Sequence, residues 1–231
     1  MFLNTALLSY RPTSNLEIAF GRDQLPTGIN IPDLAVFVRS RNRVGYYDSP
    51  TQIKAFWWGK RYFVSPYAFG PGGSEQHGDD EFGGGSLAEF DLLGKQRTIV
   101  GLNFLRGSSR NGERNLVAPY ARIGFGSWGI LAEHDFTNRT SNLGLFPSFH
   151  QSATYGQFFY YPREWLVASL IGERLRVDAP FKQQRNAGKL EISARLASQL
   201  TIGLSARLQR DPLSGGTDKT VAFSLALKSV F

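Results

Sequence analysis

The sequence predicts an all-β protein in which antiparallel strands follow one another as an up-and-down meander. Along most of the chain apolar and polar residues alternate with a period of two, as they do in a strand with one apolar and one polar face. Clusters of Gly, Pro, Asn and Asp interrupt these stretches, and 25 of the 231 residues are glycine. Short turns also alternate with long loops, which places the long loops together at one end of the predicted sheet.

The stretch from Val221 to the C-terminal Phe231 shows the alternation most clearly. Counting back from Phe231 in steps of two, five of six residues are apolar. This stretch resembles the closing strand of bacterial outer-membrane β-barrels, which typically ends in Phe and is read by the barrel-assembly machinery. The resemblance implies a multi-pass β-barrel in the outer membrane of a Gram-negative bacterium, with membrane lipid and that machinery as partners.

The apolar residues are distributed in a way that argues against a transmembrane helix. The longest clearly apolar run, from Trp165 to Gly172, is far shorter than the about 20 residues that a helix needs to cross a bilayer. Strands cross a membrane only as a closed barrel, because lipid offers no partner to the backbone at an open sheet edge. In such a barrel Leu200, Ile202 and Leu204 would face lipid, and the polar residues between them would face the lumen.

A soluble β-protein is the alternative, with its apolar faces buried between two sheets. This alternative fits less well, because about twelve strands enclose a barrel interior too wide for side chains to fill, whereas about eight suffice. The sorting of the connections also favours a membrane barrel, whose turns are short on the periplasmic side and whose loops are long outside.

We expect an antiparallel transmembrane β-barrel of about twelve to fourteen strands, in a single domain that spans residues 1–231. The predicted strands cover residues 2–10, 16–23, 34–47, 51–69, 87–93, 97–106, 116–125, 128–137, 151–161, 165–177, 188–196, 200–209 and 221–231. Their number is odd, whereas single-chain bacterial barrels have an even number of strands. Either the first segment is a plug or linker, or a strand precedes Met1, which is the explanation we favour. The second explanation predicts an open or strained seam between the two ends of the sheet.

The net charge of the chain is positive, with 26 Lys and Arg against 19 Asp and Glu, or +7. These charges alternate with strand residues instead of forming a basic tail or helix, which argues against nucleic acid as a partner. The chain has no cysteine, which excludes disulfides, thiolate metal sites and C-x-x-C-H attachment of haem.

Polar residues on the lumen face of the predicted strands would line a pore. Arg39, Arg41 and Arg43 share one face of the strand predicted over residues 34–47, where such a ladder could attract anions. Pairing with lumen carboxylates such as Glu17 would instead only stiffen the wall. The complete predicted lining is Arg39, Arg41, Arg43, Glu89, Asp91, Arg122, Glu133, Lys189, Glu191, Arg195, Arg207 and Lys228. It predicts a pore for passive or facilitated passage of small polar solutes, with a preference for anions.

Three further motifs predict neither a cofactor nor a metal site. Residues 124–129 match G-x-G-x-x-G, but an alternating strand follows where a dinucleotide site needs a helix, so the glycines predict a hairpin turn. Residues 77–81 offer oxygen ligands, but their spacing matches no EF-hand loop and predicts a solvated loop. In Glu133-His134-Asp135 the alternation turns His134 away from the two carboxylates.

Aromatic residues gather beside two predicted turns or interruptions, and they suit the girdle of aromatic rings at a membrane interface. The set is Trp57, Trp58, Tyr62, Phe158, Phe159, Tyr160, Tyr161 and Trp165. The last five bracket Pro162, which predicts that this turn lies at the periplasmic interface.

Two other functions fit a barrel of this kind. One is a structural sheath that encloses or docks a partner protein such as a multihaem cytochrome, with the haem belonging to the partner. The other follows from His150 and Ser152, which resemble the His-x-Ser element of outer-membrane phospholipase A, where Ser is the nucleophile, His its base and an Asn orients the His. Here Ala153-Thr154 stands where that family has Asn-Gly, and the next strand holds no Asn. We therefore expect no enzyme and no catalytic residue.

Overall fold

The structure is a computed structural model that describes residues 5–29, 36–42, 44, 49–71, 80–95, 97–141, 148–178, 182–197, 200–213 and 215–227. Within these residues the chain forms thirteen strands and one short helix. Their bounds are β1 Ala6–Thr13, β2 Leu16–Arg22, α1 Phe37–Ser40, β3 Thr51–Trp58, β4 Tyr62–Gly70, β5 Phe82–Asp91, β6 Thr98–Ser109, β7 Gly112–Phe125, β8 Trp128–Ser141, β9 Phe149–Arg163, β10 Leu166–Val177, β11 Gln183–Ala197, β12 Leu200–Arg210 and β13 Thr217–Leu227.

Each strand pairs with the next along the chain, so that one sheet runs in order from β1 to β13. All pairings are antiparallel, and some are unbroken over the whole strand, as in β10 and β11 from Leu166 opposite Ala194 to Val177 opposite Gln183. The registers also show which residues form rows across the sheet, because opposite residues on neighbouring strands lie about 5 Å apart. The predicted all-β antiparallel meander is confirmed.

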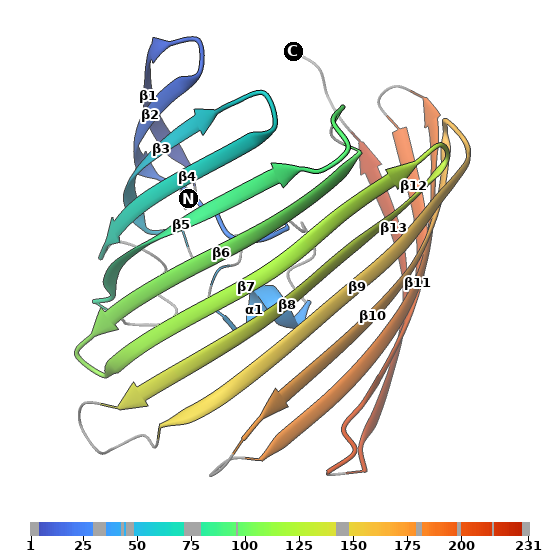
Figure 1. Cartoon of the computed structure of the whole chain (residues 1–231). Helices are drawn as coiled ribbons and strands as arrows, with labels where there is room; N and C mark the ends of the chain where they lie inside the picture. Colours follow the sequence, from blue (N-terminus) through green and yellow to red (C-terminus); the bar gives the residue numbers. More distant parts are fainter. Residues whose placement is uncertain are drawn as a thin grey trace.

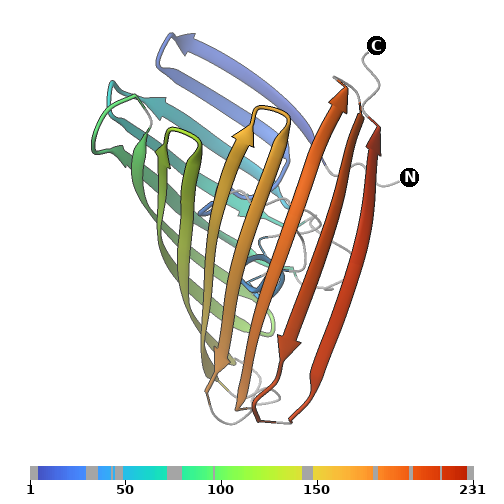
Figure 2. The ribbon, with the colours of Figure 1, turned by 90° about the vertical axis from the view of Figure 1, so that its right-hand side faces the viewer.

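The sheet curves round on itself into the wall of a barrel (Figures 1 and 2). The helix α1 lies on the concave side, where it contacts β8, β9 and β10. The strands β1 and β13 form the two edges of the sheet, and among the described residues no pairing joins them. That a further strand precedes Met1 stays a prediction.

The strand predicted over residues 34–47 is wrong. The described part of this segment forms one helical turn, α1, in which the amide of Arg41 donates to the carbonyl of Phe37 at 3.1 Å. The alternation of valine and arginine suggested a strand with two different faces, but Val38 and Arg39 are both buried. The barrel wall provides apolar and charged partners on several sides of this segment. The alternation of valine and arginine therefore reflects those partners and not the two faces of a strand.

A second error compensates for the first. The strand predicted over residues 51–69 is in fact two strands, β3 and β4, joined by a turn at residues 59–61. The amide of Gly59 donates to the carbonyl of Tyr62 at 2.8 Å and closes this turn. Aromatic residues continue on both sides of the turn and hid it in the sequence. The described strands therefore still number thirteen, with one predicted strand lost and one gained.

The two ends of the sheet carry different connections. At one end, the short-turn end, the connections are residues 14–15, 59–61, 92–97, 126–127, 164–165 and 198–199. At the other, the long-loop end, they are residues 23–50, 71–81, 110–111, 142–148, 178–182 and 211–216. The ends of the strands predicted over residues 97–106 and 116–125 are wrong, since β6 and β7 continue to a tight turn at 110–111. In outer-membrane barrels the longer loops lie outside the cell, which assigns the long-loop end to that side.

The two faces of the wall differ as the alternation predicts. On the convex face large apolar side chains are exposed, such as Leu170 at 61% and Phe223 at 70%. On the concave face Ala153 and Leu175 are fully buried. Large exposed apolar surfaces mark contact with another phase or partner, and on a barrel of this kind that phase is lipid.

In the part of the chain that the structure describes, no helix is long and apolar enough to cross a membrane.

Candidate channel lumen

The connection between β2 and β3 folds into the concave side of the wall (Figures 1 and 2). We call residues 23–50 the inner segment, of which the structure describes residues 23–29, 36–42, 44 and 49–50. A solute that passes through the barrel must pass this segment. The contacts between the inner segment and the wall therefore define the candidate site.

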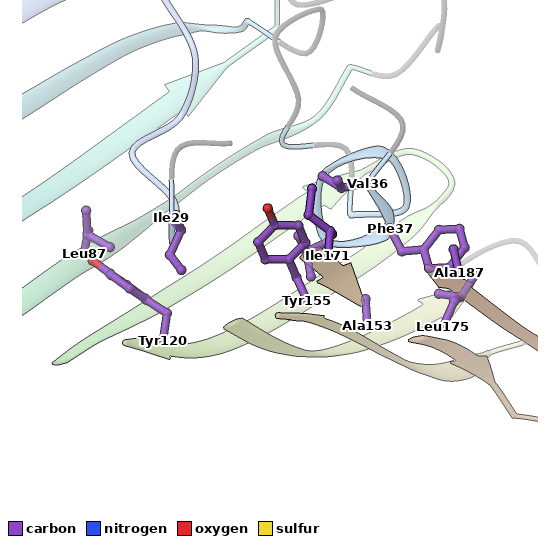
Figure 3. Close-up of a cluster of buried hydrophobic side chains, with 11 residues drawn as sticks. Ile29, Val36, Phe37, Leu87, Tyr120, Ala153, Tyr155, Ile171, Leu175 and Ala187 are labelled. Carbon is purple, nitrogen blue, oxygen red and sulfur yellow. The ribbon is translucent and has the colours of Figure 1, made fainter. Parts of the chain in front are cut away.

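One apolar cluster holds α1 against the wall. Val36 and Phe37 are buried there, and Figure 3 shows Phe37 beside Leu175 and Ala187. The complete cluster is Ile29, Val36, Phe37, Val38, Leu87, Tyr120, Ala153, Tyr155, Ile171, Leu175 and Ala187. Burying one large apolar side chain contributes about 1.5–3 kcal/mol, so this cluster alone is enough to dock the helix firmly.

A second apolar cluster holds the two ends of the inner segment against a different part of the wall. Leu25 and Val44 are buried on the side chains of Tyr67, Phe69, Leu105, Leu116 and Ala118, which come from β4, β6 and β7. The side-chain amide of Gln24 donates to the carbonyl of Val44 at 3.1 Å and joins the two ends to each other. The segment is thus fixed at several points on the wall.

Arg39 forms a buried ion pair with Glu133 of β8, with 2.9 Å between Nη2 and Oε2. Arg39 also donates to the hydroxyl of Thr27 at 3.0 Å, and the amide of Ile29 donates to Glu133 at 2.9 Å. Gly28 has a φ of +46°, and a Cβ on it would lie 2.0 Å from Oε1 of Glu133. The backbone therefore closes over the carboxylate as only glycine allows.

Asn42 is the second polar anchor, and it is fully buried. Its side-chain amide donates to Asp135, and its Oδ1 accepts from Thr137 at 2.6 Å and from Gln151 at 2.9 Å. Its backbone carbonyl accepts from Arg114. One buried residue of the inner segment is in this way bonded to three strands, β7, β8 and β9.

Glu173 of β10 connects α1 to both β10 and β12. One of its oxygens accepts from the backbone amide of Phe37 at 2.8 Å, and the other pairs with Arg207 of β12 at 3.0 Å. The guanidinium of Arg207 also stands 5.7 Å from the centre of the Phe37 ring, within the range of a cation–π contact.

A hollow of about 540 Å³ lies at the long-loop end beside the inner segment. Its lining includes Arg41 and Lys182 together with Asp211. Arg139 donates to the carbonyl of Arg41 at 3.0 Å. Burial, and to a smaller extent the nearby guanidinium of Arg185, lower the pKa of Arg41.

A smaller hollow of about 260 Å³ lies at the short-turn end. Its charged lining consists of Lys60, Arg61, Glu89, Asp91 and Arg122. Glu89 pairs with Arg122 at 2.7 Å and also accepts from the hydroxyl of Tyr120 at 2.7 Å. Both ends of the concave side therefore have polar hollows, with the inner segment between them.

The predicted lining residues on described strands lie on the concave face but have different surroundings. Glu133 is buried under Arg39, Asp91 is buried, and Arg207 is paired with Glu173. Lys189 pairs with Glu191 at 2.8 Å, and Arg195 is exposed. Arg39 and Arg41 belong to the inner segment instead of a strand ladder, and Arg43 and Lys228 lie outside the described residues. That these residues line a path for solutes stays a prediction.

The predicted lining omitted Asn42, Asp135 and Glu173, which anchor the inner segment, although the alternation already placed Asp135 on the lumen side with Glu133. Asp135 and Glu173 occupy inward positions of the alternation, so the pattern could have included them in the lining. Asn42 gave no signal, because its partners come from strands about a hundred residues further along the chain.

Two of the other motifs behave as the alternation predicts. Residues 124–129 form the hairpin between β7 and β8, with Gly126 at a φ of +54°. His134 lies on the convex face, where its Nδ1 is 2.7 Å from the hydroxyl of Thr154. The described residues contain no group of His, Asp and Glu side chains that could hold a metal ion, and residues 77–79 lie outside them.

His150 and Ser152 lie on the convex face in a hollow of about 460 Å³. Asn138 of β8 stands opposite His150, on the strand that precedes it in the chain. No hydrogen bond of the described residues joins these three side chains. That Ser152 and His150 have no catalytic role stays a prediction.

The aromatic girdle is only partly right. Trp57, Tyr62 and Tyr160 are exposed on the convex face near the short turns. Trp58 points to the concave side instead, where it lines the smaller hollow and its ring lies 6.0 Å from that of Phe63. Neighbouring residues of a strand cannot share a face, so only half of an aromatic run can face lipid.

An antiparallel meander with an apolar convex face, a polar concave face and a connection folded across its interior defines the porin class of β-barrel. This fold is one that crosses the outer membrane of Gram-negative bacteria. No family model matches the sequence, and no curated protein matches it.

Solved structures with this fold match nearly the whole chain. The outer-membrane protein OmpT of Vibrio cholerae matches with a TM-score of 0.71 and 9% identity, over 97% of this chain and 78% of that one. A form of OmpT that lacks loop L8 matches with a TM-score of 0.75. The outer-membrane channel DcaP of Acinetobacter baumannii matches with a TM-score of 0.69 and 12% identity, over 91% and 70%. The chain therefore has the fold of outer-membrane porins.

Proposed function

We propose that the protein is an outer-membrane channel for the diffusion of small polar solutes, and that it favours anions. The observation that carries the proposal is the inner segment, which is anchored across the concave side between two polar hollows. Such a segment narrows a barrel and brings fixed charges close to a passing solute, where they act most strongly.

The preference for anions follows from how the charges are paired. Carboxylates on the concave side are matched with cations in the pairs Glu133–Arg39, Glu173–Arg207, Glu89–Arg122, Glu81–Arg114 and Asp23–Lys54. Arg41 and Lys182 at the long-loop hollow, and Lys60 and Arg61 at the short-turn hollow, outnumber the further carboxylates of those linings, Asp211 and Asp91. A positive lining raises the local concentration of anions and lowers that of cations.

Conductance in a planar bilayer tests the proposal. Under a gradient of KCl the wild-type channel should give a reversal potential of the sign that chloride preference requires. The variant Arg41→Gln/Lys182→Gln should move the reversal potential clearly toward zero, because two cations leave the mouth of the channel. Arg163→Gln, an exposed change on the short-turn end of β9, is the control and should leave it unchanged. A preference for potassium in the wild type would refute the anion proposal, and the absence of any conductance would refute the channel.

The inner segment also helps to distinguish a channel from a structural sheath as the function of the barrel. A sheathed partner needs the space on the concave side, and there α1 and Leu25 already pack against the wall. A barrel that is silent in the bilayer and co-purifies with a haem protein would favour the sheath instead.

A further inference from the structure

The convex face of β9 to β13 changes from apolar to basic toward the long-loop end. One row across these strands holds Phe158, Leu170, Leu190, Ala206 and Val221. The second convex row from this one, toward the long-loop end, holds Thr154, Arg174, Asn186, Arg210 and Thr217. The row between them contains Gly156, Gly172 and Gly188, so no large side chain flanks Arg174 on its lipid side. The same row continues with Leu208 and Lys219, and Leu208 lies next to Arg210 on β12.

The charges on this surface have one sign. The convex positions of the described strands β9 to β13, on the long-loop side of the apolar rows, carry Arg174, Arg176, Arg210 and Lys219 and neither Asp nor Glu. All four basic side chains are exposed. Asp178, just beyond β10, pairs with Arg176 at 3.2 Å, and both of these side chains are at least half exposed. The surface as a whole therefore stays positive.

Arg174 and Arg210 stand on either side of Asn186 in the same row. Their Cα atoms are separated by two strand spacings, or about 10 Å. Arginine side chains are long enough to converge across this distance on one tetrahedral anion, with the amide of Asn186 between them. The apolar row that holds Leu170 and Leu190 lies four residues away along the strands, or about 13 Å, where the acyl chains of a bound lipid would reach it.

We propose that Arg174, Asn186 and Arg210 bind the phosphate of an outer-leaflet lipid whose acyl chains lie along the apolar rows of β9 to β13. The long-loop end faces outward, so this basic row lies where the phosphorylated headgroups of that leaflet begin. Charge-assisted bonds from guanidinium to phosphate are the strong contacts, and the convex location makes the site independent of passage through the lumen.

Binding of lipid A to the full chain, folded and purified in mild detergent, tests the site. The probes are lipid A with both phosphates, lipid A without phosphates, and inorganic phosphate, each followed by native mass spectrometry. The variant Arg174→Gln/Arg210→Gln should bind phosphorylated lipid A about tenfold more weakly than the wild type. Arg174→Lys/Arg210→Lys keeps the charge but loses the planar guanidinium groups. Its affinity for phosphorylated lipid A should lie between those of the wild type and the glutamine variant.

The matched control is Arg97→Gln/Arg163→Gln, which removes two exposed arginines at the short-turn end and should bind as the wild type does. Equal binding by the wild type and the Arg174/Arg210 variant would overturn the proposal, as would equal binding of lipid A with and without phosphates. Inorganic phosphate bound as tightly as lipid A would overturn the lipid as the ligand. Conductance should be unchanged in these variants, so this proposal and the channel proposal succeed or fail separately.

Discussion

At the scale of single residues, Arg39 and Glu133 form an ion pair in which both charges are buried. Arg39 is 2% exposed and Glu133 is 3% exposed, so neither charge is solvated by water. The pair is supported by further hydrogen bonds, since Arg39 donates to Thr27 and to the carbonyl of Ile29, and the amide of Ile29 donates to Glu133. Such a pair costs much to desolvate, and the loss of one partner leaves the other charge buried alone.

The variant Glu133→Gln should therefore destabilise the folded barrel by about 3–5 kcal/mol, the usual loss when one partner of a buried pair is removed. Unfolding by denaturant in detergent, followed by circular dichroism, measures the change. Adding Arg39→Met to this variant should recover part of the loss, because the stranded charge is then gone.

The control for this change is Glu191→Gln, which breaks the pair with Lys189 at 2.8 Å where the Glu191 side chain is 40% exposed. Partly exposed pairs contribute about 0–1 kcal/mol, so its effect should be small. Equal losses for the two variants would contradict the account of Arg39 as a buried anchor.

At the scale of elements, the inner segment is a separable unit. Its two ends leave the wall side by side, since the amide of Asp23 donates to the carbonyl of Pro50 at 3.3 Å. A short linker can therefore join β2 to β3 without the residues between. The wall strands keep their ladders to each other, and only the contacts with the inner segment are lost.

Replacing residues 24–49 by a short Gly/Ser linker should leave a folded barrel with a conductance about twofold higher or more, because the narrowest part of the lumen is removed. Its preference for anions should fall, because Arg41 leaves with the segment. Single-channel recording measures both quantities.

The same linker in place of residues 212–215, at the same end of the barrel, is the control and should change the conductance little. In that connection the amide of Asp211 donates to the carbonyl of Gly216 at 2.9 Å. The inner segment has the equivalent bond between Asp23 and Pro50. An unchanged conductance after removal of the inner segment would show that the segment does not narrow the path.

At the scale of the whole molecule, a net charge of +7 is divided between two surfaces. The concave side gathers cations at both hollows, and the convex side carries the basic row near the long-loop end. Fields of this kind act over a distance that salt shortens, from about 10 Å at 0.1 M to about 3 Å at 1 M.

The preference of the channel for anions should therefore decrease as the KCl concentration rises from about 0.1 M to about 1 M, because the lining charges are screened. Reversal potentials at several mean concentrations and one fixed gradient measure this trend. If the preference for anions does not change with salt, the long-range field of the lining charges does not select the solute. Selection would then come from direct contact at a narrow constriction from which water is excluded.

Much of the fold could be predicted from the sequence, because a strand in a meander depends mainly on its own alternation and on its neighbours in the chain. The order of the strands from β5 to β12 was predicted correctly for this reason, as were the faces of β5, β7, β8, β11 and β12, to which the predicted lining residues belong. Their ends near residues 106–116 were not, because strands that extend beyond the apolar band become polar on both faces and look like loops.

The sequence by itself determined the alternation of faces, the meander and the sorting of turns and loops, which are properties of neighbouring residues and of a period of two. Only the tertiary structure decided that residues 36–42 enter the barrel, that Arg39 meets Glu133, and that Arg174, Asn186 and Arg210 share a row. Those contacts join residues far apart in the chain, and they depend on the registers and the curvature of the wall. A local pattern of valine and arginine contains no information about either.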